Sequence, residues 1–237
     1  MTTGIMQKQL TKNILFYRFG FSRHLGDEQL KELLLHFPTQ KTADASLTGG
    51  RAPVATAVIE DIGPVVIKQY LRGGCMRFIL KNRYVKWGKT RSQVEYESMH
   101  NLRRLGIRTP EPVAYAYRGF PLYSAWLITR KIEKACSLAE LSCQDIQRVS
   151  GIMKKVIAQI DKLIECRFRH VDLHPGNILV DGANNIFILD FDKGYWSSTP
   201  REKLYDLYCK RWQRAVSKHK LPKILNDMMQ AGLKKLK

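Results

Sequence analysis

The sequence has no long apolar run and no closely paired cysteines. Its apolar stretches fall far short of the roughly 20 residues that a membrane-spanning helix needs. Near the N-terminus, Ile14-Leu15-Phe16 is too short for a secretory signal and is flanked by Lys12 and Arg18. Because its five cysteines are scattered and form no C-x-x-C pair, we expect neither a zinc site nor a disulfide framework, and a reducing cytoplasm fits best.

Acidic residues are also scarce. The chain contains 40 lysines and arginines against 21 aspartates and glutamates, which gives a net charge of +19. Two regions carry most of the excess, Ile67 to Arg108 and Arg201 to Lys237. Such a distribution indicates an anionic partner, which is a nucleic acid, an anionic lipid or a phosphorylated substrate, unless the surface is simply basic and solvated.

The order of predicted elements favours an α+β protein in two lobes. The first half is rich in β-branched residues and the second half is mostly helical, and the break falls near Arg130 to Glu133, giving lobes 1–130 and 131–237. The predicted strands are Val54 to Ile59, Val65 to Tyr70, Val113 to Tyr117, Tyr123 to Thr129, Ile178 to Val180 and Ile186 to Leu189. The predicted helices are Leu25 to Phe37, Arg91 to Leu105, Gln144 to Cys166 and the basic segment from Arg201 onward, with a short apolar segment at Leu138 to Leu141.

The segment from His170 to Asn177 has the spacing of a kinase catalytic loop. A histidine is followed two residues later by Asp172 and five residues after that by Asn177, as in H-R-D-L-x-x-x-N, with Val171 in place of the arginine. Phosphoryl transfer needs a carboxylate that orients the attacking hydroxyl and oxygen ligands that hold magnesium on the phosphates. The spacing predicts Asp172 as the catalytic base and Asn177 as a magnesium ligand.

A second short motif follows in the right order. The apolar strand Ile186 to Leu189 ends in Asp190-Phe191, which is where the D-F-G aspartate of a kinase binds magnesium. Each match alone is weak, but the two together predict ATP and Mg²⁺ as cofactors and Asp190 as the second metal ligand. A polar hairpin with coincidental Asp and Asn is the alternative.

The first half should then provide a lysine for the phosphates. Lys68 ends Pro64-Val65-Val66-Ile67-Lys68, which is the V-A-I-K pattern in outline. Two glutamates of the next predicted helix, Glu95 and Glu97, compete as its partner, and we prefer Glu95 because Met99 and Leu102 follow it on one helical face.

No G-x-G-x-x-G loop is present. Gly49 and Gly50 with Arg51 lie where a phosphate loop is needed, so we expect these three residues to bind phosphate through backbone amides and the guanidinium group.

Several segments together resemble a known family. They are Gly50-Arg51, Lys68 to Gly74, Thr90-Arg91 with Glu95, Pro110 to Ala114, Leu127 to Thr129, His170 to Leu173 with Asn177 to Leu179, and Asp190 to Gly194. From Thr48 to Trp196 the chain is similar to the 3-deoxy-D-manno-octulosonic acid (Kdo) kinases, a lipopolysaccharide core kinase group of the protein-kinase-like superfamily. It departs from their pattern at Ala52, where a second glycine is expected.

The resemblance implies a protein-kinase-like fold and transfer of the ATP γ-phosphate to the 4-hydroxyl of Kdo. The implied acceptor is a Kdo-lipid A precursor at the cytoplasmic face of the bacterial inner membrane. The basic segments Lys81 to Arg91 and Arg201 to Lys237 would then contact the membrane or substrate phosphates. A lipopolysaccharide heptose kinase is the alternative within the same group.

Other function classes fit less well. A protein kinase needs an Ala-Pro-Glu segment and a large helical subdomain, and too little chain follows Asp190 for these, so only a small atypical protein kinase stays open. A basic nucleic-acid-binding module would explain the charge but not Asp172, Asn177 and Asp190, and the basic regions lack interleaved aromatics. We therefore expect no nucleic acid and no particular protein partner, although a pseudokinase also fits the sequence.

Three aromatic residues and two histidines have two interpretations each. Phe78, Tyr84 and Trp87 are either a platform for sugar or lipid or part of the first lobe's core. His170 and His174 are either a metal pair or, in the kinase interpretation, residues that hold the catalytic loop, with His170 bonded to backbone near the Asp190 turn.

Overall fold

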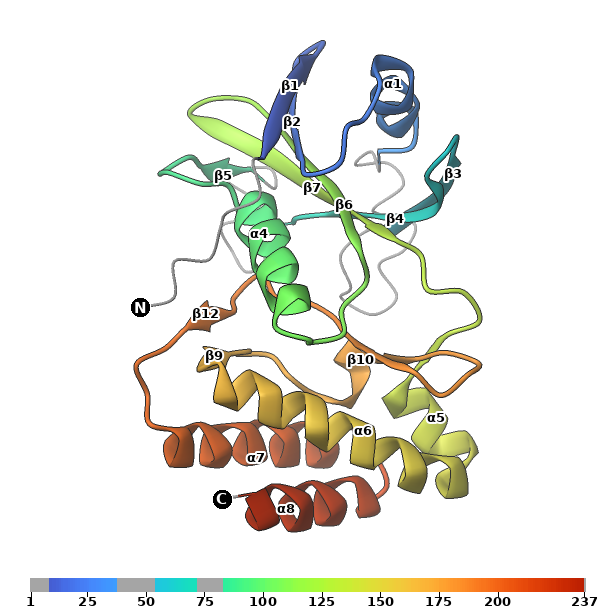
Figure 1. Cartoon of the computed structure of the whole chain (residues 1–237), viewed down its shortest axis with the longest axis vertical. Coiled ribbons are helices and arrows are strands. Elements are labelled where there is room, and N and C mark those ends of the chain that lie inside the picture. Colours follow the sequence, from blue (N-terminus) through green and yellow to red (C-terminus); the bar gives the residue numbers. More distant parts are fainter. Residues whose placement is uncertain (1–8, 38–53, 72–82, 237) are drawn as a thin grey trace. The chain divides into compact units, whose positions relative to one another are not determined.

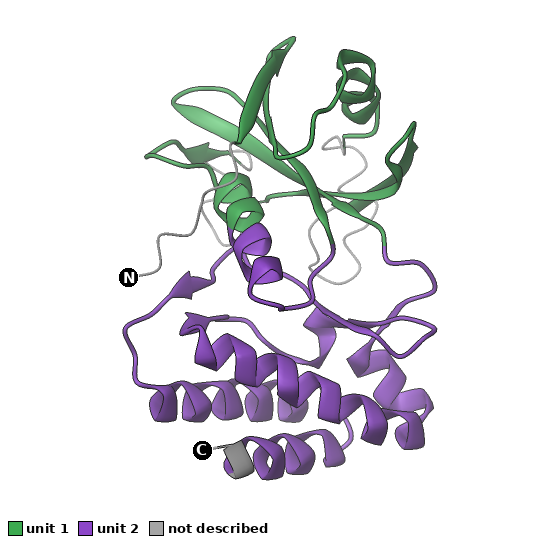
Figure 2. Ribbon diagram, in the orientation of Figure 1, with its two compact units in different colours: residues 1–97, 111–131 green, residues 98–110, 132–237 purple. Residues whose placement is uncertain are grey.

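The computed structural model of the protein describes residues 9–37, 54–71 and 83–236 (Figure 1). The chain divides into two compact units, one of residues 1–97 with 111–131 and the other of residues 98–110 with 132–237 (Figure 2). Antiparallel strands and helices alternate along the chain, which confirms the predicted mixture of α and β structure.

The first unit is built on one antiparallel sheet with the strand order β1-β2-β6-β7-β4-β3, to which β5 adds by pairing with β7. Its strands are β1 Leu10–Ile14, β2 Tyr17–Phe21, β3 Val54–Ile59, β4 Gly63–Gln69, β5 Tyr84–Val85, β6 Pro112–Arg118 and β7 Leu122–Arg130. Four of these strands match the predictions closely. The residues from Glu60 to Pro64 include Asp, Gly and Pro and so predict a turn between β3 and β4; in the structure Asp61 and Gly63 adopt positive φ values there.

The hairpin of β1 and β2 was not predicted. Its residues Lys12, Asn13 and Arg18 interrupt any apolar alternation, as is common at the edge of a sheet. The pairing of β2 with β6 depends on Gly20, which lies opposite Tyr115, because a Cβ at Gly20 would stand only 2.2 Å from the tyrosine ring. The close approach of an aromatic side chain therefore requires glycine at this position.

Helix α1 (Asp27–Leu35) was predicted within Leu25 to Phe37. Leu30 and Leu33 are fully buried in the core of the first unit, as the helical spacing predicts. Phe37, which follows the helix, stacks on Trp126 of β7 with 4.9 Å between ring centroids. The aromatic contact joins the end of the helix to the centre of the sheet.

Helix α4 (Arg91–Arg104) begins in the first unit and ends in the second. Thr90 caps it, since the Thr90 hydroxyl accepts a hydrogen bond from the backbone N–H of Gln93. The sequence predicts a partial apolar stripe on this helix, made of Val94, Met99, Leu102 and Leu105. The prediction is partly wrong, because Val94 and Leu105 are exposed. The buried face of the helix instead consists of Ser92, Glu95, Tyr96, Met99 and Leu102. The polar residues of this face can be buried because each has a polar partner.

The second unit contains most of the helices. They are α5 Leu138–Gln144, α6 Ile146–Glu165, the 3₁₀ turn η1 Pro175–Asn177, α7 Arg201–Lys218 and α8 Ile224–Leu236. Its short strands form a sheet of order β11-β10-β8 and a pair β12-β9. These strands are β8 Cys136–Ser137, β9 Phe168–Arg169, β10 Ile178–Val180, β11 Ile186–Ile188 and β12 Tyr195–Trp196.

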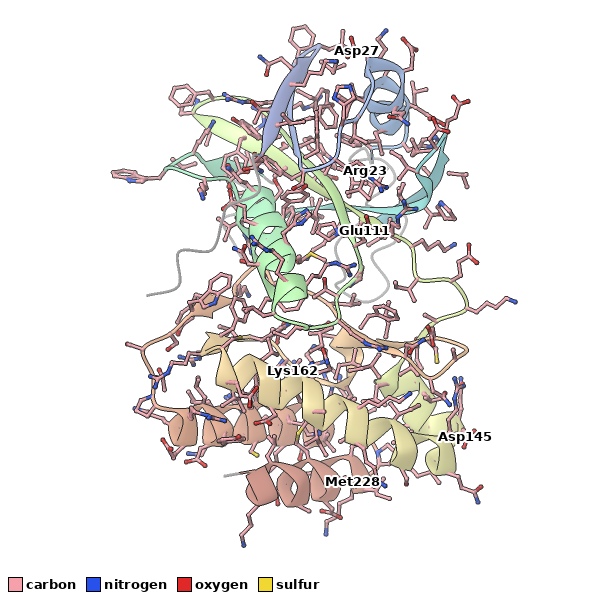
Figure 3. The ribbon with its side chains drawn as sticks, in the orientation of Figure 1. Arg23, Asp27, Glu111, Asp145, Lys162 and Met228 are labelled. Carbon is pink, nitrogen blue, oxygen red and sulfur yellow. The ribbon has the colours of Figure 1, made fainter. Side chains whose placement is uncertain are left out.

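Helix α6 forms the core of the second unit. Asp145 lies at its start and accepts a hydrogen bond from the Arg148 N–H at 3.0 Å, while Lys162 lies near its end (Figure 3). The sequence predicts an apolar stripe along this helix. Ile146 is exposed and Ile157 is half-buried, whereas the remaining positions are buried as expected, namely Val149, Ile152, Met153, Val156, Ile160 and Ile164. Helix α8 approaches α6 closely at Gly232, where a Cβ would come within 2.4 Å of Ile157.

Candidate active site

The predicted catalytic loop connects β9 to β10 in the second unit. Leu173 and Pro175 are buried and anchor the loop, whereas the Asp172 side chain is 40% exposed. The His174 Nδ1 accepts a hydrogen bond from the N–H of Gly176 and caps η1. The loop thus buries its apolar residues and leaves the predicted catalytic carboxylate accessible from solvent.

His170 holds the loop from inside the protein. The ring is buried, and its Nε2 lies 2.8 Å from the carbonyl oxygen of Leu189, so the Nε2–H tautomer donates to that carbonyl. The ring also contacts Phe191 edge to face at 4.9 Å. Burial lowers the pKa of His170 below its usual value, so this histidine is a neutral structural residue and the predicted hydrogen bond beside the Asp190 turn is confirmed.

Asn177 links the two predicted motifs. Its Nδ2 donates to the backbone carbonyl of Asp172 at 3.0 Å, and its own carbonyl accepts from the N–H of Leu189 at 2.9 Å. These two bonds connect the residue before Asp190 to the residue that carries the predicted catalytic carboxylate. With Nδ2 engaged by protein, the Oδ1 of Asn177 is the atom that remains to serve as a ligand.

Asp190 follows β11 in an unusual conformation. Its φ is +66°, a left-handed value that aspartate tolerates better than most residues but that still costs free energy. Strained residues of this kind cluster at functional sites. An aspartate carboxylate together with an asparagine carbonyl is a set of hard oxygen donors, and this chemistry fits Mg²⁺.

Asp172 has a partner that the sequence did not reveal. Arg211 of α7 donates to Asp172 Oδ1 from Nε at 3.2 Å and also from Nη2. Both bonds reach the same oxygen, and within the described part of the chain Oδ2 accepts no hydrogen bond. Because the two residues lie 39 positions apart in the chain, no local motif could have predicted the pair.

Lys68 and Glu95 form an ion pair in the first unit. Lys68 Nζ lies 3.2 Å from Glu95 Oε2, and the glutamate side chain is only 2% exposed. Tyr70, which follows the end of β4 and lies two residues after Lys68, donates its hydroxyl to the same Glu95 oxygen. The competing candidate, Glu97, binds Lys89 at 2.6 Å instead. The structure therefore pairs Lys68 with Glu95, and their contribution to nucleotide binding stays a prediction.

The placement of α4 explains the choice of glutamate. The Ser92 hydroxyl donates to the carbonyl of Ala116 at 3.3 Å, and the Tyr123 hydroxyl accepts from the N–H of Arg91 at 3.1 Å. These bonds fix the first turn of the helix on strands β6 and β7. Glu95, one turn after Ser92, then points inward, whereas Glu97 lies some 200° further round the helix.

Comparison with known proteins identifies the family. The family model described as "Lipopolysaccharide kinase (Kdo/WaaP) family" matches residues 40–223. The chain belongs to this family. The match includes all the predicted site residues and also Arg211, and it extends beyond the Thr48 to Trp196 resemblance at both ends. As a lipopolysaccharide kinase, the protein is an ATP-dependent phosphotransferase.

Three curated relatives of this lipopolysaccharide kinase share one name. A protein of Vibrio vulnificus (strain CMCP6) called 3-deoxy-D-manno-octulosonic acid kinase is 30% identical over 186 residues, which are 75% of this chain and 78% of the relative. A protein of the same name from Vibrio cholerae is 29% identical over 70% of each chain. A third, from Xylella fastidiosa (strain M23), is 34% identical over 62% of this chain and 59% of its own length.

Some predicted elements of the lipopolysaccharide kinase site lie outside the described residues. These are the phosphate loop at Gly49, Gly50 and Arg51, the Arg72-Gly73-Gly74 segment and Phe78. Of the other two aromatic residues considered as a platform, Tyr84 is buried and packs on Tyr123, whereas Trp87 is 94% exposed. Tyr84 therefore fits the interpretation as a core residue, whereas Trp87 is at the surface, where it could serve as a platform.

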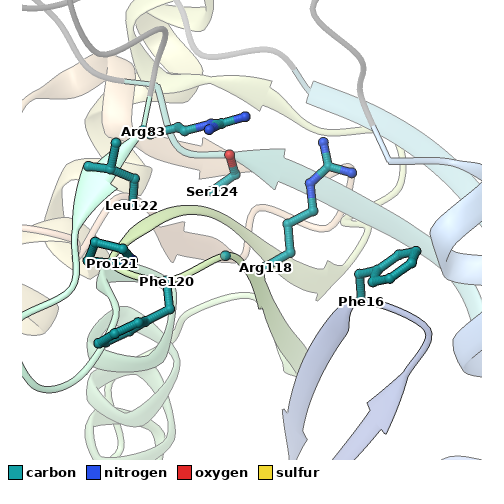
Figure 4. A pocket seen from close by; sticks show the side chains of 8 residues that line it. Phe16, Arg83, Arg118, Phe120, Pro121, Leu122 and Ser124 are labelled. Atoms are coloured by element: carbon teal, nitrogen blue, oxygen red, sulfur yellow. The ribbon is translucent and has the colours of Figure 1, made fainter.

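Trp87 belongs to an exposed aromatic surface of the first unit. Phe16, in the β1–β2 turn, and Phe120, in the β6–β7 turn, are also more than three-quarters exposed. A depression of about 480 Å³ with Arg118 between these two phenylalanines connects the turns (Figure 4). The Lys86 N–H donates to the carbonyl of Pro121 at 2.8 Å, which ties the segment of Trp87 to the same region.

In the described residues, no helix is both long and apolar enough to cross a membrane.

Proposed function

We propose that this lipopolysaccharide kinase transfers the γ-phosphate of ATP to the 4-hydroxyl of Kdo in a Kdo-lipid A precursor. The observation that carries the proposal is the hydrogen-bonded link from Asp172 through Asn177 to Leu189, next to Asp190, because it joins the two motifs on which phosphoryl transfer depends. The name shared by the relatives supports Kdo as the acceptor sugar.

In the proposed reaction Asp172 orients the acceptor hydroxyl through Oδ2 and accepts its proton as the new oxygen–phosphorus bond forms. The bond between the γ-phosphorus and the bridging oxygen breaks, and ADP leaves. Arg211 holds Oδ1 and so fixes the direction in which Oδ2 points. A fixed carboxylate is effective because the loose transition state of phosphoryl transfer demands position more than strong basicity.

The remaining residues handle the phosphates. Asn177 and Asp190 would hold Mg²⁺, which neutralises the charge of the phosphate oxygens when bound. Lys68 would bind phosphate oxygens of ATP, and Glu95 keeps its ammonium group in place with the help of Tyr70. Gly49, Gly50 and Arg51 are proposed to bind phosphate as well.

We propose a protein-kinase-like arrangement in two lobes, residues 1–130 and 131–237. Support comes from the distribution of the predicted site, since Lys68 and Glu95 lie in one compact unit and Asp172, Asn177 and Asp190 in the other. The antiparallel sheet of the first and the helices of the second are the element types expected of the two lobes.

We also propose that the enzyme binds the cytoplasmic face of the inner membrane as a peripheral protein. The exposed Trp87, Phe120 and Phe16 support this, because aromatic rings are favoured at the interface between lipid headgroups and acyl chains. Arg118 in the same depression, with Arg83 lining it, adds the positive charge that anionic lipid attracts. The occupant we assign to this surface is an anionic bilayer.

Transfer of labelled phosphate from ATP to purified Kdo-lipid A precursor tests the proposed function. We expect transfer by the natural protein, loss of transfer in Asp172→Ala, and normal transfer in Asp227→Ala, a control that removes an exposed aspartate of α8. Phosphorylation of a heptosylated core or of a protein, with none of the Kdo acceptor, would reject the proposed substrate while keeping the kinase.

A further inference from the structure

A basic depression lies beside the predicted catalytic carboxylate. It has a volume of about 390 Å³ and lies entirely within the second unit. Its lining residues are Val171, Asp172, Lys193, Arg211, Arg214 and Lys218. Four of these six side chains are cations and only one is an anion, so the depression carries an excess of positive charge.

Helix α7 provides three of the four cations. Arg211, Arg214 and Lys218 follow one another at intervals of three and four residues, which places them on one face of the helix. The buried residues Tyr208, Trp212 and Ala215 lie on the adjoining face of the helix, with Tyr208 and Ala215 three residues before and four residues after Arg211. Like charges at these intervals repel each other, so the row does not stabilise the helix by itself.

The excess charge is not neutralised within the described part of the protein. Arg211 is paired with Asp172. Arg214 donates only to a backbone carbonyl, that of Lys210 at 3.4 Å, and Lys193 and Lys218 are exposed and form no ion pair with the described residues. Three cations therefore surround the carboxylate without a counter-ion, which is the arrangement of a site that binds an anion.

We propose that Arg214, Lys218 and Lys193 form a subsite for an oxyanion of the acceptor, next to the hydroxyl that is phosphorylated. This inference rests on the proposed function, which brings the acceptor hydroxyl to Asp172. Two groups of a Kdo-lipid A precursor have the required chemistry, the carboxylate of the acidic sugar and a phosphate of the lipid. Arginine binds either group with paired hydrogen bonds, and lysine adds a mobile point charge.

Such a subsite would favour an acidic sugar over a neutral one as the acceptor. An acceptor that has no oxyanion beside the hydroxyl would leave the three cations without an anionic partner. Such an acceptor would bind less tightly. Arg211 differs from the other three residues, since its guanidinium group is already engaged by Asp172 and acts through that residue.

Steady-state kinetics of the full chain with ATP and Kdo-lipid A precursor tests the subsite. The double variant Arg214→Gln, Lys218→Gln should raise the KM for the acceptor by about tenfold or more, because a hydrogen bond to a charged group is lost at each position. The KM for ATP should stay within about twofold of the natural value by the same reasoning. The control, Lys203→Gln with Lys210→Gln, removes two exposed charges of the same helix outside the depression.

Modified acceptors distinguish the two oxyanions. If the subsite binds the sugar carboxylate, its methyl ester should raise the KM of the natural protein but not that of the double variant. If it binds a lipid phosphate, a dephosphorylated lipid should have that effect instead. An unchanged acceptor KM in the double variant, an equal change in the control, or a change in the KM for ATP alone would each overturn the subsite. Absence of any transfer by the natural protein would instead reject the proposed function.

Discussion

Arg211 donates two hydrogen bonds to a single oxygen of Asp172, from Nε at 3.2 Å and from Nη2, and leaves the second carboxylate oxygen for another partner. The arginine comes from α7 and the aspartate from the loop after β9. An arginine in this position fixes the rotation of the carboxylate, which a lone aspartate at the surface would not control.

Arg211→Gln should therefore lower kcat by about 10- to 100-fold, because a small misplacement of a catalytic group is enough to reduce the rate on this scale. The effect should fall on kcat more than on the KM for either substrate. Arg211→Lys should restore part of the activity, since it keeps a cation beside Asp172. Lys210→Gln, its neighbour on α7, serves as the control. A normal kcat in Arg211→Gln would show that Asp172 does not need this partner.

Glu95 and Glu97 should differ sharply when each is changed to glutamine. Glu95→Gln removes the buried partner of Lys68 and should reduce kcat/KM for ATP by about tenfold or more, as expected for loss of a charged hydrogen bond. Glu97→Gln breaks only the more exposed pair with Lys89 and should change this value by less than about twofold. ATP titrations of both variants make the comparison, and equal effects would contradict a special role for Glu95.

Trp87 and Phe120 should contribute to membrane binding. Replacement of both by serine removes two exposed rings and should weaken binding to vesicles that contain anionic lipid by about tenfold or more, given roughly 1.5–3 kcal/mol for each large apolar side chain that is fully buried. Sedimentation with vesicles at several salt concentrations measures the effect. Leu35→Ser is the control, because Leu35 is exposed on α1 and does not line the depression between the aromatic turns. Unchanged binding by the double variant would assign the membrane contact to another surface.

Replacement of Gly194 by any residue with a side chain should destabilise the protein. A Cβ at this position would stand 2.5 Å from the ring of Phe168, which is fully buried and packs against Phe191 and Trp196. Gly194→Ala should lower the free energy of unfolding by about 1–3 kcal/mol through overpacking. Gly182→Ala, where no atom lies within 4 Å of the new Cβ, should have little effect. Chemical denaturation of the two variants provides the comparison, and equal stability would show that Phe168 moves freely.

His170 should make stability depend on pH in the acidic range. Burial lowers its pKa from 6.5, against the opposing effects of the Leu189 carbonyl and of Asp190 and Asp172. The unfolded chain therefore takes up a proton at higher pH than the folded protein does, so this stabilisation is complete above about pH 6.5 and declines as the pH falls below that value. Burial shifts the pKa of His174 in the same direction.

The melting temperature between pH 8 and pH 5 tests this dependence. The natural protein should lose stability below pH 6.5, and His170→Gln should show a shallower decline even though it is less stable throughout. His36→Gln, which changes an exposed histidine, should retain the natural slope. An unaltered slope in His170→Gln would mean that other groups cause the pH dependence.

The sequence alone was sufficient for features in which neighbouring residues carry the information. The spacing from His170 to Asn177, the apolar strand before Asp190 and the alternation around Lys68 are all local patterns, and most predicted strands and helices agree with the structure to within a few residues. The hairpin of β1 and β2 was not predicted, because polar residues at a sheet edge interrupt the apolar alternation on which strand predictions depend.

The tertiary structure decided what depends on contacts between distant segments. Glu95 rather than Glu97 pairs with Lys68 because Ser92 and Tyr123 fix the rotation of α4 on the sheet. The pattern of apolar residues in the sequence does not specify that rotation. Arg211, Arg214 and Lys218 were only part of a basic tail in the sequence, and the packing of α7 placed them beside Asp172. The sequence determined which residues have the chemistry of phosphoryl transfer, whereas folding determined their partners, because side chains far apart along the chain meet only when its helices and strands pack.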